Sequence, residues 1–533
     1  MVNPLFFCVL CIDKTYEEIV KSKWYIFVKK GGKIVVFSSL FFLYLFLPLN
    51  LVTYYFAKTT KARNIVMLIF SLVFYTWGEP KYVLLLLFMT LSDWLISLFI
   101  EKQKPQGALA KLGIVLMAVV NLGLLGFFKY GTFIIENIGF LIKQDLNSFE
   151  FFKVVSSFLA KIDVASVSDA GVFEIILPIG ISFYTFQLVS YVIDVYRKDV
   201  PAQKNFATLL LYVSLFHQCI AGPIVRYKDV CAELQERRAS AQDVADGIWR
   251  FCFGLAKKAI LANAMGSIAD NFLKSDNLSG SSALALWIGV LAYSLQIYLD
   301  FSAYSDMAIG MGRMIGIHYR ENFDYPYTSR SVTEFWRRWH ISLGSFFRDY
   351  VYIPLGGNRK GKFRTILNLF VVWAVTGLWH GASWNFVLWG LYFFVFIFIE
   401  KLFLSKLLSK DRVVSHIYLI IIIYFGWILF RFENMSDIWL VLKGMFGQNG
   451  NAFTNFETTT LLKSNIFILI FCAAVSTPIV KKIGSLVRYT YMDKPLVPVV
   501  YSIGRIIIPL ILLLLSTAAL VGDSFNPFLY FQF

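Results

Sequence analysis

The sequence has 533 residues, of which 58% are apolar, 18% aromatic and only 16% charged. Soluble globular domains carry about a quarter charged residues and disordered chains are poor in aromatic residues, so both classes are excluded. There are 50 Lys and Arg residues against 34 Asp and Glu residues, and the formal net charge is +16. Because the basic residues stand in short loops between apolar segments, they predict the cytoplasmic loops of a multi-pass membrane protein and no nucleic-acid partner.

Apolar segments long enough to cross a bilayer recur along the chain. A spanning helix needs about 20 mainly apolar residues. We therefore expect an all-α membrane protein with about ten to thirteen membrane helices and with amphipathic helices at the interface. The two longest segments are expected to be bent or to hold more than one helix. The candidate spans are 34–57, 64–78, 82–100, 112–128, 173–195, 206–225, 282–317, 365–399, 413–431, 461–480 and 501–521.

No fixed-period repeat and no Ser-, Gly- or Pro-rich linker divides the chain, so residues 34–521 are expected to form one membrane domain. Residues 1–33 mix charged residues with short apolar pieces and lack the order of a signal peptide, and we interpret them as an N-terminal extension of unknown role. Residues 522–533 form a C-terminal tail rich in aromatic residues. The spacing of the six cysteines predicts no zinc site, and no metal is expected.

A single histidine stands in a long apolar segment. Between Thr365 and Ile399 there is no Asp, Glu, Lys or Arg, and the one group there that titrates near neutral pH is His380. Gly377 and Gly381 lie four residues apart, so they share a helix face and allow a neighbouring helix to approach closely. Burial favours the neutral imidazole, which is the form that a general base requires. A structural hydrogen bond between helices is an equally good interpretation.

A second histidine lies on a predicted interfacial helix. Ser331 and Glu334 fit a capping box, which predicts that a helix begins there. One continuous amphipathic helix would place His340 on its apolar side, and such a helix is usually a packing element. A catalytic role for His340 requires that it faces the same cavity as His380. The residues expected on the apolar face are Trp336, His340, Leu343 and Phe347.

Three other polar residues in apolar segments are expected to be structural. His217 has a polar neighbour but no further constellation around it. Asp300 and Asp306 lie inside the long segment 282–317 and need partners there. The nearby Arg313 and Arg320 are the expected partners.

The turn-forming segment 353–362 carries three basic residues. It lacks the spacing of a nucleotide-binding P-loop. Its charges can bind the phosphates of a molecule such as coenzyme A, or anionic lipid. The basic residues are Arg359, Lys360 and Lys362.

Four segments carry a family resemblance in combination: Glu334–Leu343, Arg348–Tyr350, Pro354–Lys360 and Leu378–Ala382. The supporting segments are Phe37–Ser39, Phe127–Tyr130, Pro178–Phe186, Ala221–Ile224 and Tyr298–Gly310. Together they resemble the membrane-bound O-acyltransferases. The match is closest to the bacterial branch of alginate and peptidoglycan O-acetyltransferase membrane subunits.

The resemblance implies membrane helices around a central funnel or tunnel with a histidine in its middle. It assigns this histidine to His380 and a second characteristic position to His340. It also implies a multi-pass enzyme of the bacterial inner (cytoplasmic) membrane that moves acetyl groups from cytoplasmic acetyl-CoA to an extracytoplasmic polysaccharide. Acetyl-CoA is then a substrate, and no bound cofactor is expected. The implied partners are an extracytoplasmic SGNH-type O-acetyltransferase, the polysaccharide acceptor and membrane lipid.

The tail ends with Pro527–Phe533, where Tyr530 carries the one hydroxyl among aromatic neighbours. From the residues alone this is an interfacial aromatic anchor. The resemblance implies a second role, in which Tyr530 carries the acyl group.

The expected mechanism is acyl transfer from the thioester to a hydroxyl. His380 acts as general base on the accepting hydroxyl, with Tyr530 as the candidate acceptor, and His340 orients or stabilises the tetrahedral intermediate. Three alternatives stay open at this point. They are D-alanyl transfer to teichoic acid, acylation of a lipid or protein, and a transporter or flippase whose histidines relay protons.

Overall fold

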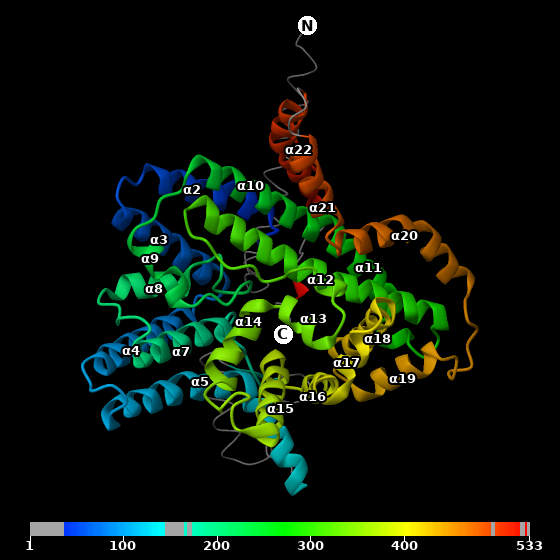
Figure 1. Cartoon of the computed structure of the whole chain (residues 1–533), viewed down its shortest axis with the longest axis horizontal. Coiled ribbons are helices and arrows are strands. Elements are labelled where there is room, and N and C mark those ends of the chain that lie inside the picture. The colour runs from blue at the N-terminus through cyan, green and yellow to red at the C-terminus, as the bar shows by residue number, and fades with distance from the viewer. Residues whose placement is uncertain (1–36, 144–164, 168–172, 492–495, 523–527, 530–533) are drawn as a thin grey trace.

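The computed structural model describes residues 37–143, 165–167, 173–491, 496–522 and 528–529 (Figure 1). The regular secondary structure of the described part is helical except for two short antiparallel strands, β1 (Ala165–Val167) and β2 (Phe173–Ile175). Ala165 pairs with Ile175 in this hairpin. The predicted helical membrane fold is therefore confirmed, with one small hairpin added to it.

Seven helices in the described part are long and apolar enough to cross a membrane. The expected number of ten to thirteen is thus not confirmed by length and composition. The helices are α4 (Val83–Glu101), α5 (Ala108–Ile142), α12 (Ala283–Met314), α16 (Trp384–Ile399, continued to Leu408), α18 (Arg412–Arg431), α20 (Phe456–Val475) and α22 (Val497–Val521).

Two of the expected spans can be compared directly with the structure. The segment 365–399 is two helices, α15 (Gly361–His380) and α16, separated by a short turn, as its length had indicated. The segment 206–225 is not a span, because its helix α8 (Phe206–Ser214) is short and the chain then continues without regular structure among buried residues. Non-helical backbone at membrane depth is tolerated where protein surrounds it.

The remaining helices are shorter or less apolar. They are α2 (Leu47–Phe56), α3 (Thr60–Gly78), α7 (Ile181–Arg197), α9 (Tyr227–Gln235), α10 (Ala241–Ala256), α11 (Asn263–Phe272), α13 (Val332–Arg338), α14 (Ile341–Phe347), α17 (Ser405–Leu408), α19 (Met435–Met445) and α21 (Ile479–Leu486). The short π- and 3₁₀-helical pieces are η1 (Phe42–Phe46), η3 (Lys257–Ala262), η4 (Ser275–Asn277), η5 (Pro326–Thr328), η6 (Arg348–Tyr352), η7 (Glu400–Leu404) and η8 (Val487–Tyr491).

Helix α12 is the central element of the fold, and it crosses the middle of the molecule in Figure 1. Its most apolar stretch is 78% buried, against 17% for α20 and α22. It contributes to both hydrophobic clusters: residues up to Phe301 pack with α16, α18 and α19, and residues from Tyr304 pack with α3, α7 and α8. The boundary between the two clusters therefore falls at 301–304.

The carboxylates of α12 have other partners than the sequence predicts. Asp300 pairs with Lys258 at 2.7 Å and Asp306 pairs with Lys257 at 2.5 Å. Both lysines belong to η3, which packs beside α12 although it lies more than forty positions away in the sequence. The prediction was wrong because it considered only nearby positions. The expected partners Arg313 and Arg320 pair with other carboxylates.

Candidate active site

His380 is the last residue of α15, where α15 and α16 meet backbone to backbone. A Cβ atom added at Gly377 would overlap the carbonyl oxygen of Phe386, and one added at Gly390 would overlap that of Trp373. The predicted close approach of a neighbouring helix at Gly377 is therefore confirmed. This contact holds the end of α15, and His380 with it, inside the protein.

Aromatic rings surround the imidazole of His380, whose exposed fraction is 5%. The ring centroids of Trp379 and Trp389 each lie 4.9 Å from it, and that of Phe430 lies at 5.2 Å. All three rings meet the imidazole edge to face. These contacts restrict the orientation of the imidazole and exclude water from its sides.

Two residues of α5 hold the end of α15. The ammonium of Lys129 donates to the carbonyl oxygen of Trp379, and the Tyr130 hydroxyl donates to that of Leu378 at 2.8 Å. Carbonyls in the last turn of a helix lack partners within the helix and carry partial negative charge, so a cation is favourable there. Lys129 and Tyr130 thus fix the residues directly before His380. The sequence placed them only in a supporting motif.

His340 lies at a break between two helices, which corrects the expected continuous helix. Helix α13 ends at Arg338, α14 begins at Ile341, and His340 has φ = 45°. The predicted start is confirmed, since the Ser331 side chain accepts from the backbone N–H of Glu334. The break follows from a tertiary contact, because the backbone carbonyl of Asn322 accepts from the N–H of Ile341 at 3.0 Å.

The hydrogen bonds of Asn322 define the tautomer of His340. Asn322 Oδ1 accepts from the backbone N–H of Ser342 at 3.2 Å and from its hydroxyl at 2.8 Å. The Nδ1 atom of His340 lies 3.1 Å from the same oxygen. Because that oxygen only accepts, Nδ1 carries the hydrogen and the neutral imidazole has its lone pair on Nε2.

His340 and His380 line the same cavity, which has a volume of about 250 Å³. The exposed fractions of the two histidines are 2% and 5%. Arg337 and Arg348 line the cavity too, and both are exposed. The cavity therefore runs from exposed guanidinium groups to buried imidazoles, and the condition set for His340 is met. Aromatic and aliphatic side chains of α13–α16 form most of the remaining wall.

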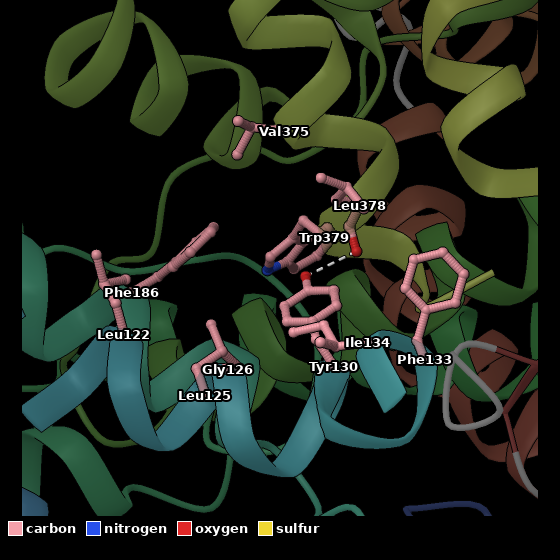
Figure 2. Close-up of a pocket in the computed structure, with 10 residues that line it drawn as sticks. All are labelled: Leu122, Leu125, Gly126, Tyr130, Phe133, Ile134, Phe186, Val375, Leu378 and Trp379. Carbon is pink, nitrogen blue, oxygen red and sulfur yellow. Dashed lines mark hydrogen bonds between the residues drawn. The ribbon is translucent and has the colours of Figure 1, made fainter. Parts of the chain in front are cut away.

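A second cavity of about 380 Å³ lies between α5 and α15 (Figure 2). Apolar side chains of both helices face it, and the figure shows the bond from the Tyr130 hydroxyl to Leu378 at its edge. Trp379 lines this cavity, and its ring centroid lies 5.9 Å from that of His340 and 4.9 Å from that of His380. One tryptophan therefore contacts the second cavity and both histidines.

The other predicted residues lie elsewhere. Arg359, Lys360 and Lys362 are exposed and do not belong to the lining of either cavity. His217 packs in the core with its Nδ1 3.4 Å from the Tyr319 hydroxyl, in agreement with a structural role.

Some predictions lie outside the part of the chain that the structure describes. Tyr530 is one of them, and residues 1–33 are another. In the described ranges no three His, Cys, Asp or Glu side chains are grouped to hold a metal ion.

The sequence is similar to known proteins over most of its length. The model of the membrane-bound O-acyltransferase family matches residues 198–436, which include both histidines. The chain is 36% identical to a "probable alginate O-acetylase" of Azotobacter vinelandii over 94% of this chain and the whole of that protein. It is 38% identical to one of Pseudomonas aeruginosa over 81% of this chain and 78% of that protein. It is 30% identical to a peptidoglycan O-acetyltransferase of Helicobacter pylori over 78% of this chain and 81% of that protein. The chain belongs to the membrane-bound O-acyltransferase family.

Proposed function

We propose that this acyltransferase moves acetyl groups from cytoplasmic acetyl-CoA across the bacterial inner membrane for O-acetylation of an extracytoplasmic polysaccharide. An alginate-like exopolysaccharide and peptidoglycan are the candidate acceptors, because relatives that align over most of the chain carry these names. The observation that carries the proposal is the single cavity that joins exposed arginines to His340 and His380. An extracytoplasmic SGNH-type acetyltransferase would receive the acetyl group.

The charges at the cavity support a donor that carries phosphate. Arg337 and Arg348 are exposed on its lining, and guanidinium groups bind phosphate in bidentate fashion. Arg359, Lys360 and Lys362 follow in the next loop and add positive charge nearby in the sequence. This whole region belongs to a basic segment that charge bias assigns to the cytoplasmic side. In this proposal the cavity is the cytoplasmic part of a passage through the membrane domain.

The chemistry is a displacement at the thioester carbonyl. His380 takes the proton of an accepting hydroxyl, for which Tyr530 is the candidate, and the oxygen attacks the carbonyl carbon. The C–S bond then breaks, and the coenzyme A thiolate leaves and takes up the proton from the imidazolium. Positioned proton transfer of this kind contributes typically about 10²–10⁴-fold. The hydroxyl has a single proton, which goes to His380, so His340 acts from the same cavity by orienting or stabilising the tetrahedral intermediate.

The test is the acetyl content of envelope polysaccharide in cells that carry variants of the chain. His380→Ala is expected to abolish acetylation at a normal level of membrane protein, because the accepting hydroxyl keeps its proton. His318→Gln is the matched control: this histidine is exposed and lines neither cavity, so acetylation stays normal. Full acetylation with His380→Ala would overturn the assignment.

The carrier role of Tyr530 has its own test. After exposure of the purified protein to labelled acetyl-CoA, the C-terminal peptide is expected to gain one acetyl group by mass spectrometry. Tyr530→Phe removes the hydroxyl and is expected to abolish both this mass shift and polysaccharide acetylation. Unchanged acetylation by Tyr530→Phe would exclude an obligatory carrier.

A further inference from the structure

A buried ion pair joins the middle of α12 to η3, and the catalytic proposal makes no use of it. The Lys258 ammonium is 2.7 Å from Asp300 Oδ1, and the two side chains are 5% and 2% exposed. Removing two charges from water costs free energy that their attraction often does not repay. The stability of the fold therefore does not by itself explain why this pair is present.

The described end of the tail lies directly against this pair. The backbone N–H of Leu529 donates to Asp300 Oδ2 at 2.7 Å. The Lys258 ammonium lies 4.9 Å from the centroid of the Phe528 ring, and this ring is fully buried. The Tyr304 ring meets the Phe528 ring edge to face at 5.0 Å. Because Asp300 and Tyr304 are four residues apart, one face of α12 provides both contacts.

This contact is close to the candidate active site. Phe301 follows Asp300 on α12, and its ring centroid lies 4.7 Å from that of His340, edge to face. Leu529 packs against the hydrophobic cluster that contains Phe301 and Trp389, and Trp389 also contacts His380. The tail is thus held at Asp300, directly beside a residue that contacts His340, although it lies more than two hundred positions away in the sequence.

We propose that Lys258 and Asp300 form a docking site for an aromatic peptide segment, the C-terminal tail of this chain, and act as positioning residues for acyl transfer. Asp300 accepts the main-chain N–H of Leu529 and Lys258 binds the face of Phe528, so the next residue, Tyr530, is delivered to the site. The inference rests on the proposed carrier role of Tyr530, and it adds the contacts that place that residue.

Two double variants of the full-length protein test the docking site. Lys258→Met with Asp300→Leu removes both charges and the acceptor oxygen, whereas Lys258→Met with Asp300→Asn removes the charges and keeps an acceptor. Neither leaves an unpaired buried charge, so the membrane domain is expected to stay folded. Hydrogen–deuterium exchange of the peptide that contains Leu529 should rise about tenfold or more in the first variant. It should rise less in the second, which loses the Lys258 cation at the Phe528 ring but keeps an acceptor for the Leu529 N–H.

Controls separate docking from general loosening. Asp306→Asn changes a second carboxylate of α12, which pairs with Lys257 and Arg250, and is expected to leave tail exchange unchanged. Phe528→Ala changes the tail and leaves every charge of the membrane domain in place. It is expected to raise tail exchange. The proposal is overturned if tail exchange is unchanged in the Lys258→Met, Asp300→Leu double variant and also in Phe528→Ala. It is overturned as well if Asp306→Asn raises tail exchange as much as the double variant does.

Acetylation measured on the same variants distinguishes this inference from the proposed function. A released tail with a lower kcat and an unchanged KM for acetyl-CoA supports both, because the donor cavity is intact. A released tail with normal acetylation overturns the carrier role of Tyr530 and leaves the docking site standing. A tail that stays protected from exchange in the Lys258→Met, Asp300→Leu double variant and in Phe528→Ala overturns the docking site, whatever the level of acetylation.

Discussion

Asn322 Oδ1 faces three partners at once: the backbone N–H of Ser342, the hydroxyl of Ser342 and Nδ1 of His340. This oxygen fixes which nitrogen of His340 carries the hydrogen and, with it, the direction of the lone pair. Its role differs from that of the aromatic rings around His380, which restrict orientation and leave the tautomer open. A single oxygen atom therefore determines how His340 can act, whereas packing determines the orientation of His380.

Replacing Asn322 tests this dependence. Asn322→Ala is expected to lower kcat for acetyl transfer by about 10- to 100-fold, because the His340 imidazole loses its fixed tautomer. Asn322→Asp keeps an acceptor oxygen and is expected to retain more activity than Asn322→Ala at the same protein level. Equal activity of the alanine variant and the unmodified protein would show that His340 does not depend on this contact.

His380 could be predicted from the sequence because it is the one group titrating near neutral pH in a long apolar segment. The surroundings of His340 could not, since its partner Asn322 lies eighteen positions earlier in an irregular loop. The cavity arginines Arg337 and Arg348 lie inside motifs that the sequence singled out. Their position on the cavity depends on the break at His340, which no local pattern signals.

Helix α15 carries His380 at its end, and two neighbouring helices determine where that end lies. Helix α16 approaches through Gly377 and Gly390, and α5 provides Lys129 and Tyr130. The glycine contact was predictable from the spacing of small residues in an apolar helix. The cap from α5 was not, because its residues lie about 250 positions away along the chain.

The packing of α15 on α16 predicts a clear difference between two glycine substitutions. Gly390→Ala is expected to destabilise the protein by about 1–3 kcal/mol, because the added Cβ overlaps the backbone of α15 at Trp373. Gly123→Ala is the control, since nothing lies within 4 Å of a Cβ added there on α5. Thermal midpoints in detergent measure both, and equal midpoints would contradict the close packing.

For the whole molecule, the apolar segments predicted a helical membrane protein, but they did not predict that α12 would be one continuous helix, mostly buried. The number of spans was less predictable, because a count of apolar residues does not separate lipid-facing helices from buried irregular chain. The segment after Ser214 shows the difference, since it is apolar and buried but not helical. The route of the tail back to Asp300 was equally hidden, because only the folded chain brings the two together.

A surface cluster outside the spans gives the protein a predicted pH dependence. Partial burial lowers the pKa of His318, but hydrogen bonds to the carboxylates of Glu233 and Asp243 outweigh this and raise it above its usual value. A raised pKa in the folded state means that the contribution to stability is complete at pH below the unfolded value, about 6.5. It is lost as the pH rises through the folded value.

Thermal midpoints measured from pH 5.5 to 8.5 test this dependence. The unmodified protein is expected to lose stability with rising pH relative to His318→Gln, in which this contribution is absent. Parallel curves for the two proteins would contradict the contribution of this cluster.

The most direct test of the catalytic account is the release of free coenzyme A from acetyl-CoA by the purified full-length protein. The unmodified protein is expected to release the thiol as the acetyl group leaves, and His380→Ala is expected to slow this release by about 10²-fold or more at an unchanged KM for acetyl-CoA. Release by His380→Ala at the rate of the unmodified protein would contradict the account.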